Sequence, residues 1–261
     1  MHPALWVSQS GLDAQQTNMT VTSNNLANVS TNGFKKNAAI FKDLMYQKIR
    51  QPGATTAGDG QLPSGLMLGA GVKLSGTEKD FRNGAFERTD RALDMAISGK
   101  GFFQVMRPDG TMGYTRDGKF QLNSDGEVVT SEGLRLQPAI NIPQDAKNIN
   151  ITSNGIVSVT ISGQMAPQEI GPIELVDFIN EGGLEPIGDN LYLETNASGA
   201  PIVAQAATDG MGSIDQGALE ASNVNVVEEL VKLIQIQRSY EMNAKSIETV
   251  DGMLQYVSQV L

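Results

Sequence analysis

Two short stretches carry residue types that could do chemistry. Residues 121–132 place Asn, Asp, Gly and Glu at the third, fifth, sixth and twelfth positions, as in a calcium-binding EF-hand loop. The first position is Gln121 instead of Asp and the flanks read as strands, so a β-hairpin explains Asp125-Gly126 without a metal. Gly99-Lys100-Gly101 is similar to part of a phosphate loop, but it lacks the upstream glycine and the Ser or Thr that binds magnesium. We therefore expect no metal and no bound small molecule.

The side chains needed for most enzyme mechanisms are missing. His2 is the only histidine and there is no cysteine, which excludes a His-dependent triad, a multi-His metal site and thiolate chemistry. No G-x-S-x-G nucleophile elbow occurs. The neighbouring acids Glu228 and Glu229 precede a helical pattern, where we expect them to be exposed and to stabilise the helix dipole. The sequence predicts no enzyme, no catalytic residue and no cofactor.

Composition narrows the classes of partner. The net charge is −10 and no run of Lys or Arg exceeds two, which argues against a nucleic-acid surface or a polybasic membrane patch. The 28 glycines among 261 residues favour many turns and small interfaces over one massive core. The first residues lack a basic region followed by a long apolar run, so neither a cleaved signal peptide nor a transmembrane span is expected.

Both ends of the chain are predicted to be helices that need a partner. Near the C-terminus, residues three and four apart in alternation form a heptad seam: Leu233, Ile236, Tyr240, Asn243, Ile247, Val250, Leu254, Val257 and Leu261. Near the N-terminus, apolar residues recur every seven: Leu5, Leu12, Met19 and Leu26. Asn225 followed by Glu228 is typical of a helix start. A seam this narrow needs another helix to cover it, either from the other end of the chain or from a neighbouring copy.

The segment after the first helix changes in pattern twice. The helical pattern runs to about Val29, and Ser30-Thr31-Asn32-Gly33 has strong turn chemistry. A second short helix is expected over Ala38 to Ile49. From Gln51 to Gly71 the composition changes to Gly, Pro, Ala, Thr and Ser with little periodicity. This stretch is either a flexible loop or an extension that orders on a partner.

The centre of the chain is predicted to be all β. From Leu93 onward the apolar period drops towards two, and Asp-Gly pairs at 109–110, 117–118 and 125–126 predict consecutive hairpins. Further strands are expected over 149–151, 156–161, 173–178 and 191–193. The predicted fold class is α+β, with long N- and C-terminal helices forming a coiled-coil-like layer and, between them in sequence, a central all-β domain of hairpins.

Several motifs are similar to one known family. The stretch from Asn24 to Lys35 resembles the signature of the bacterial flagellar rod and hook proteins. The stretches 222–226 and 237–243 are similar to the other terminus of that family, and 99–103 and 114–118 also match. The resemblance implies a hollow helical tube whose inner layer is made of the terminal helices, with the β-domain outside. It also implies export through the flagellar type III apparatus without a cleaved signal peptide.

Within this family, the segments Tyr46 to Ala54 and Leu62 to Leu66 resemble those of distal-rod members. The resemblance therefore predicts a structural subunit of the distal rod, which transmits torque from motor to hook. The alternatives are a hook or proximal-rod subunit, or a secreted trimeric β-domain enzyme or adhesin. Expected partners are copies of the chain itself, proximal-rod and hook subunits at the ends, surrounding ring proteins and the export apparatus. The expected location is the flagellar basal body, crossing the periplasm.

These patterns together predict five regions along the chain. They are an N-terminal helical region (1–45), a distal-rod-type extension (46–71), a connector (72–95), a β-rich domain (96–215) and a C-terminal helix (216–261). Both heptad stripes are expected to form subunit interfaces. In the extension, rigid or turn-forming residues and apolar anchors are expected to wedge between subunits and stiffen the tube: Gln51, Pro52, Gly53, Leu62, Pro63 and Leu66.

Overall fold

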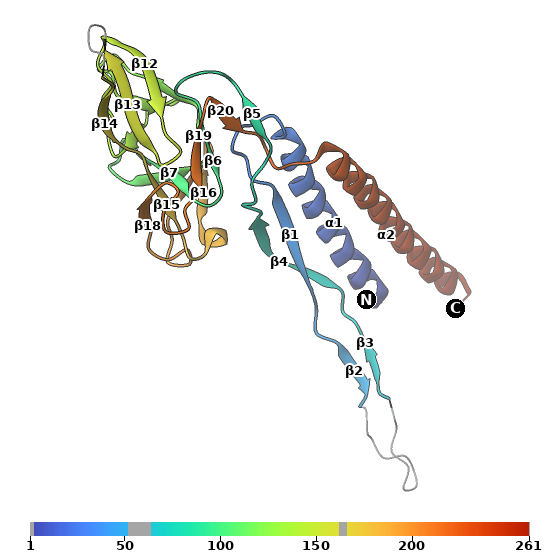
Figure 1. Cartoon of the computed structure of the whole chain (residues 1–261). Coiled ribbons are helices and arrows are strands. Elements are labelled where there is room, and N and C mark those ends of the chain that lie inside the picture. The colour runs from blue at the N-terminus through green and yellow to red at the C-terminus, as the bar shows by residue number, and fades with distance from the viewer. Residues whose placement is uncertain (1–2, 52–63, 162–165, 261) are drawn as a thin grey trace. The chain divides into compact units, whose positions relative to one another are not determined.

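The computed structural model describes residues 3–51, 64–161 and 166–260 (Figure 1). The chain divides into two compact units that interleave in sequence. The first unit comprises residues 1–27, 37–78 and 225–261, and the second comprises 28–36 and 79–224. No helix among the described residues combines the length and the apolar character needed to cross a membrane.

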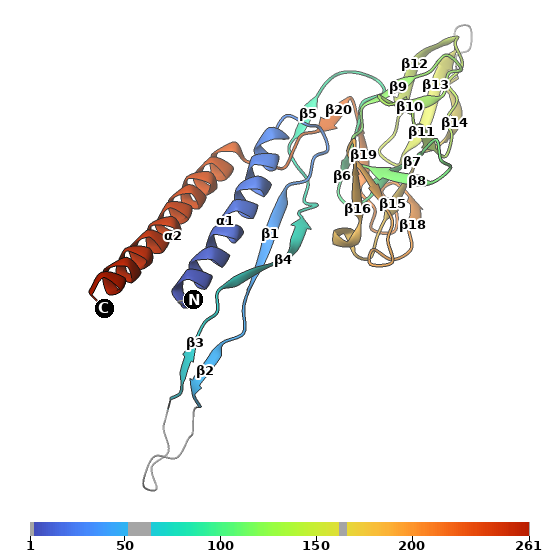
Figure 2. The same ribbon diagram turned by 180° about the vertical axis from the view of Figure 1, so that it is seen from behind.

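The first unit contains both long helices. Helix α1 (Pro3–Ala27) contacts helix α2 (Val226–Val260). The N-terminal end of α1 and the C-terminal end of α2 lie at the same end of the pair in both views (Figures 1 and 2). The helices are therefore antiparallel. Strand β1 (Asn37–Asp43) pairs with β4 (Val72–Lys79) and packs along α1, and β2 (Gln47–Arg50) pairs antiparallel with β3 (Leu66–Leu68). The predicted α+β class with two terminal helices in contact is confirmed.

The start of α2 follows from its sequence. The side-chain oxygen of Asn225 accepts hydrogen bonds from the backbone N–H groups of Val227 (3.0 Å) and Glu228 (3.4 Å). This cap satisfies two of the amides that a helix N-terminus leaves unpaired. Glu228 is exposed, as expected, but Glu229 is buried, so the prediction that both acids face solvent is wrong for Glu229.

The short helix predicted over Ala38 to Ile49 is also wrong, because this stretch forms strands β1 and β2. The N-terminal helix ends at Ala27, close to its predicted end near Val29. Along the first five residues of β1, half-buried and exposed side chains alternate, which is the period of two of a strand. The strand is stabilised by pairing with β4 and by packing against α1. Neither partner could be inferred from these seven residues alone.

The second unit is built from antiparallel β-strands. Its largest sheet has the order β16-β17-β8-β7-β11-β10-β9, with β15 pairing both β7 and β18. Smaller sheets are β12-β13-β14, β19-β6 and β20-β5. The bounds of its elements are β5 (Phe86–Arg88), β6 (Met95–Ser98), β7 (Phe102–Met106), β8 (Met112–Thr115), β9 (Phe120–Leu122), β10 (Val128–Thr130), β11 (Arg135–Gln137), β12 (Ala146–Ile151), β13 (Ile156–Ile161), β14 (Gln168–Pro172), β15 (Glu174–Asp177), the 3-10 helix η1 (Glu181–Gly183), β16 (Glu185–Gly188), β17 (Leu191–Leu193), β18 (Ile202–Gln205), β19 (Ser213–Gln216) and β20 (Ala218–Glu220).

Two of the three Asp-Gly pairs make the predicted hairpins. Gly110 lies between the paired strands β7 and β8, and Gly126 between β9 and β10, both with positive φ. Gly118 instead connects β8 and β9, which do not pair with each other. A Cβ atom on Gly118 would overlap the carbonyl of Met95, and the Gly118 carbonyl accepts a hydrogen bond from the Met95 amide. Close backbone approach, and not a hairpin turn, requires this glycine.

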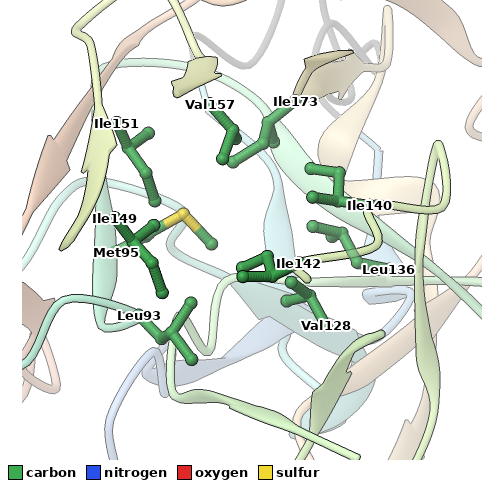
Figure 3. A pocket seen from close by; sticks show the side chains of 10 residues that line it. All are labelled: Leu93, Met95, Val128, Leu136, Ile140, Ile142, Ile149, Ile151, Val157 and Ile173. Carbon is green, nitrogen blue, oxygen red and sulfur yellow. The ribbon is translucent and has the colours of Figure 1, made fainter. Parts of the chain in front are cut away.

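The core of the second unit lies between its sheets and consists of aliphatic and aromatic side chains. A small void remains there, with a volume of about 10 Å³, between side chains that converge from several strands (Figure 3). Its lining includes Met95, Val128, Leu136, Ile151 and Val157, and it exposes no polar surface. A void of this size and polarity does not favour a water molecule, so it is a packing defect and not a binding site.

Candidate assembly surface

Two contacts fix the register of the helix pair in the first unit. Asn25 of α1 hydrogen-bonds Glu229 of α2, and Gly11 of α1 lies against Asn243 of α2. On each helix the two contacting residues are fourteen positions apart, which is two heptads, so the helices pack with the 3.5-residue repeat of a coiled coil. If this register continues to the end of α1, its first described residue, Pro3, lies opposite Asp251.

The contact at Asn25 is a buried polar clasp. The Asn25 side chain donates to the Asn37 carbonyl (2.9 Å) and to a Glu229 carboxylate oxygen (3.3 Å), and it accepts from the Asn37 amide (2.9 Å). Asn25 and Glu229 are each 1% exposed. Lys232 pairs with the other Glu229 oxygen at 2.9 Å. One asparagine therefore ties α1 to both β1 and α2, and each of the polar groups it buries is hydrogen-bonded.

The sequence reading missed this clasp. The predicted N-terminal stripe, Leu5, Leu12, Met19 and Leu26, is half-buried throughout. Gly11 and Asn25, whose contacts with α2 fix the register, belong to a neighbouring stripe displaced by one residue. The buried residues of α1 are Ala14, Thr22 and Asn25, which are small or polar. The sequence did contain a signal for this contact, because Gly11 and Asn25 share one heptad position. A small residue lets two helices approach closely, and a hydrogen-bonding residue can join them.

The structure places the C-terminal seam partly against α1. Ile236 is buried, at 4% exposed, and Leu233, Asn243, Ile247 and Val250 are half-buried. The remaining described members, Tyr240, Leu254 and Val257, are exposed, and Leu261 lies outside the described residues. The buried and half-buried members therefore lie between Leu233 and Val250, a span in which Tyr240 alone is exposed, and both described members after Val250 are exposed.

Beyond Asp251, α2 extends past α1. Residues 251–260 continue for about 15 Å at the rise of an α-helix, and we call them the α2 overhang. Its apolar side chains are strongly exposed, with Met253 at 70% and Tyr256 at 69%. A second exposed apolar group lies near the start of α2 and comprises Val227, Leu230, Val231 and Ile234. Contiguous apolar surface of this kind marks an interaction site.

The predicted extension is an antiparallel hairpin in its described part. Gln47, Lys48 and Arg50 of β2 are in register with Leu68, Met67 and Leu66 of β3. Gln51 and Leu66 are exposed. Pro52, Gly53, Leu62 and Pro63 lie outside the described residues. The arms of the segment are paired strands, so the flexible-loop alternative is wrong for these arms.

The chain that follows the hairpin, at the start of β4, is anchored to α1 through Ser10. The Ser10 hydroxyl donates to the Val7 carbonyl (2.8 Å) and accepts from the Val72 amide (3.2 Å). Gly71 has a φ of +108°, and a Cβ atom there would overlap the Ser10 hydroxyl. Glycine is required at this position both by the backbone conformation and by the closeness of α1.

Two of the family motif stretches, 24–35 and 114–118, meet in the second unit, where Lys35 and Arg116 form a buried ionic cluster with Glu220. Lys35 pairs with Glu220 at 2.7 Å, and Arg116 lies 3.4 Å from the other Glu220 oxygen, with all three side chains 1% exposed. Burial and then the neighbouring Arg116 lower the pKa of Lys35, whereas Glu220 opposes this shift. The Gly84 amide also donates to Glu220 (2.9 Å). The cluster joins segments from three distant parts of the chain.

The candidate metal loop is a turn stabilised by its own side chain. The Asn123 side-chain oxygen accepts from the amides of Asp125 and Glu127, both at 2.9 Å. Over the ranges that the structure describes, no group of three or more His, Asp or Glu side chains could hold a metal ion.

Comparison with known proteins places these features in a family context. Three family models match successive parts of the chain: "Flagella basal body rod protein" at residues 5–35, "Flagellar hook protein FlgE/F/G D1 domain" at 96–159 and "Flagellar basal body rod FlgEFG protein C-terminal" at 215–260. The first and third cover α1 and α2, and the second covers much of the second unit.

Full-length relatives carry the same description. The flagellar basal-body rod protein FlgG of Buchnera aphidicola subsp. Schizaphis graminum is 56% identical over 260 residues, covering 100% of both chains. FlgG of Caulobacter vibrioides is 47% identical over 258 residues and 98% of both chains. FlgF of the same organism is 35% identical over 255 residues, covering 95% of this chain and 93% of its own. Within one organism, the chain is thus more similar to FlgG than to FlgF.

Proposed function

The chain belongs to the flagellar basal-body rod protein family, and from that premise we propose that it is a structural subunit of the distal rod. In this role many copies polymerise into a hollow helical drive shaft that transmits torque from motor to hook. The observation that carries the proposal is the apolar surface of α2, which α1 covers only in part. In a rod, this surface contacts neighbouring copies.

We assign the two terminal helices to the inner layer of the tube and the β-rich unit to its outside. The predicted interface residues on both helices, from Leu5 to Leu26 and from Leu233 to Val257, then serve two purposes. Those near Ile236 hold α1 and α2 together within a copy. Those near Leu254 are available to other copies, because they are exposed in the subunit.

We assign the hairpin and its continuation, residues 46–71, to contacts that stiffen the tube. A free linker gains nothing from exposed leucines, whereas a segment laid against neighbours does. Stiffness matters because a drive shaft must transmit torque without bending. Gln51, Pro52, Gly53, Leu62, Pro63 and Leu66 are the residues proposed to carry this contact.

The partners at the rod's ends and surface follow from the same role. They are proximal-rod and hook subunits, the surrounding ring proteins and the type III export apparatus, which would deliver the chain across the inner membrane without a cleaved signal peptide. The rod subunit has no catalytic part in this proposal. The exposed apolar surfaces on the helices, and not a cleft lined by titratable groups, are its functional surface.

Electron microscopy of the concentrated protein tests the proposal. Straight hollow tubes are expected. Curved, flexible tubes would indicate a hook subunit, and discrete trimers would indicate the secreted enzyme or adhesin class.

A matched pair of variants tests the role of the seam. Ile247→Asp places a charge on the half-buried face of α2 and is expected to abolish tubes, since an unpaired buried charge costs several kcal/mol. Thr249→Asp introduces the same charge on the exposed face and is the control. Tubes of normal length from Ile247→Asp would contradict the proposed inner layer.

Deletion of residues 51–66 tests the extension separately. Polymerisation is expected to persist, because the helices and the β-rich unit remain. The rods are expected to bend more under the same flow or to end at the wrong length. Straight rods and normal swimming in the deletion strain would argue that the segment is an ordinary loop.

A further inference from the structure

The first unit contains an apolar groove at the end of the helix pair where α1 begins. It encloses about 400 Å³ between the first turns of α1 and the hairpin, and its lining includes Pro3, Trp6, Val7, Leu44 and Leu68. We call it the Trp6 groove. Near the groove, the contacts of Ser10 with Gly71 and Val72 hold α1 against the start of β4.

The Trp6 groove has the properties of a docking site and not of a solvated surface. Trp6 is 57% exposed although it is the largest apolar side chain in the sequence. Val7 and Leu68 are also exposed. Gln47 is the one lining residue with a polar side chain. An occupant must therefore present apolar side chains and few polar groups that need a partner.

The α2 overhang supplies side chains of this kind. Met253, Leu254, Tyr256 and Val257 are all exposed in the subunit, so the overhang does not occupy the groove of its own copy. The overhang also continues the heptad seam, whose last half-buried member is Val250. A seam that runs on past its intrachain partner needs a second helix to complete it.

Charge favours the same pairing. Within three positions of a lining residue, the strands and their connections carry four cationic residues, Lys42, Lys48, Arg50 and Lys73, and one acid, Asp43. This is a local excess of positive charge in a chain whose net charge is −10. A partner segment with the opposite sign is attracted and oriented by it.

The end of α2 carries that opposite sign. Glu248 and Asp251 are the only charged residues between 246 and 260, and both are acidic and exposed. The last turns of α2, from Glu248 onward, therefore combine apolar side chains with negative charge, whereas the apolar Trp6 groove has an excess of cationic residues within three positions of its lining.

We propose that the α2 overhang of one copy docks in the Trp6 groove of a second copy, an inference that rests on the proposed function. The two patches are different, so each copy contributes a groove to one neighbour and an overhang to another. A contact of this heterologous type does not close on itself in a pair and generates an open helical array. The docked overhang completes the seam that α1 leaves uncovered.

Disulfide cross-linking tests the contact directly, because the native chain has no cysteine. Copies carrying Leu68→Cys in the groove are mixed with copies carrying Val257→Cys on the overhang and are oxidised during polymerisation. A disulfide-linked dimer is expected on a non-reducing gel. The matched control replaces Leu68→Cys with Leu74→Cys, at a similarly exposed leucine on β4 outside the groove, and no dimer above background is expected.

The outcomes separate this contact from the proposed function. Tubes without the Leu68–Val257 cross-link would overturn the contact and leave the rod function standing. A cross-link equal to that of the Leu74 control would overturn it as well. If the native chain formed no tubes at any concentration, the rod function would fail, and the dimer assay in dilute solution would still decide the contact.

A second measurement does not depend on cysteine reactivity. Trp6→Ala removes the largest groove side chain and is expected to raise the critical concentration for polymerisation about tenfold. Glu248→Lys with Asp251→Lys is expected to raise it as well, and Lys48→Glu with Arg50→Glu in the same chain is expected to restore part of the loss. A critical concentration unchanged by Trp6→Ala, or no rescue by the charge exchange, would contradict the proposed docking.

Discussion

Gly11 of α1 and Asn243 of α2 approach so closely that a Cβ atom built on the glycine would lie 2.9 Å from the side-chain nitrogen of Asn243. Asn243 is the one polar member of the C-terminal seam, and it lies opposite the one glycine of α1. A small residue on one helix thus makes space for a polar residue on the other. The contact specifies one register for the pair, as single polar residues do in coiled coils.

Gly11→Leu is predicted to separate the two helices locally. The added side chain cannot fit against Asn243, so amide-exchange protection of α2 between residues 229 and 250 should fall. The control is Gly252→Leu in the α2 overhang, where an added Cβ meets no atom within 4 Å. Equal protection in the two variants would contradict the register described here.

Asn25→Ala is predicted to destabilise the first unit by about 2–3 kcal/mol, because it leaves the backbone amide and carbonyl of Asn37 without their partner and removes a donor from buried Glu229. Urea unfolding followed by amide exchange in β1 measures the loss. Ser23→Ala, at an exposed position on the same helix, should change stability by less than about 0.5 kcal/mol. A similar small effect for Asn25→Ala would show that water replaces the clasp without loss.

Glu220→Gln is predicted to destabilise the second unit by about 3–5 kcal/mol, because Lys35 and Arg116 would remain buried without their anion. Lys35→Met should cost less, since Glu220 keeps Arg116 and the Gly84 amide. The exposed Glu185→Gln is the control for loss of charge alone. Urea unfolding of the β-rich unit measures all three, and the reverse order of Glu220→Gln and Lys35→Met would contradict this account.

The second unit is predicted to lose stability as the pH rises from 10.5 to 12. Burial raises the pKa of Tyr192 from 10.0 to about 12, and burial and Glu194 do the same for Tyr114. A raised folded-state pKa means that the stabilisation is complete below pH 10 and is lost as the pH rises through about 12. Lys35, whose pKa is lowered, acts in the opposite direction, but only below its unfolded value of 10.5.

Tyr192→Phe should therefore flatten the dependence of unfolding free energy on pH between 10.5 and 12. The exposed Tyr256→Phe serves as the control. Urea unfolding at fixed ionic strength measures the slope. An unchanged slope in Tyr192→Phe would mean that other groups cause the alkaline loss of stability.

The sequence alone determined the elements whose causes are local. Asn225 caps α2 because a side-chain oxygen there reaches amides two and three residues on, and this geometry needs nothing from elsewhere in the chain. The hairpin turns at Gly110 and Gly126 are local in the same way, because each depends on a positive φ at one glycine. The family motifs could also be identified from the sequence, because they are defined by residue types.

The tertiary structure decided which side chains meet. Lys35 and Glu220 pair across 185 positions, and Asn25 and Glu229 across 204, and no local spacing encodes either distance. Strand β1 reads as a helix in isolation and becomes a strand because β4 and α1 flank it. The heptad pattern predicted two long helices, but the register that buries Gly11 and Asn25, and that leaves the α2 overhang uncovered, depends on how two distant segments pack. Packing energies between such segments exceed local preferences, so the tertiary contacts determine the final arrangement.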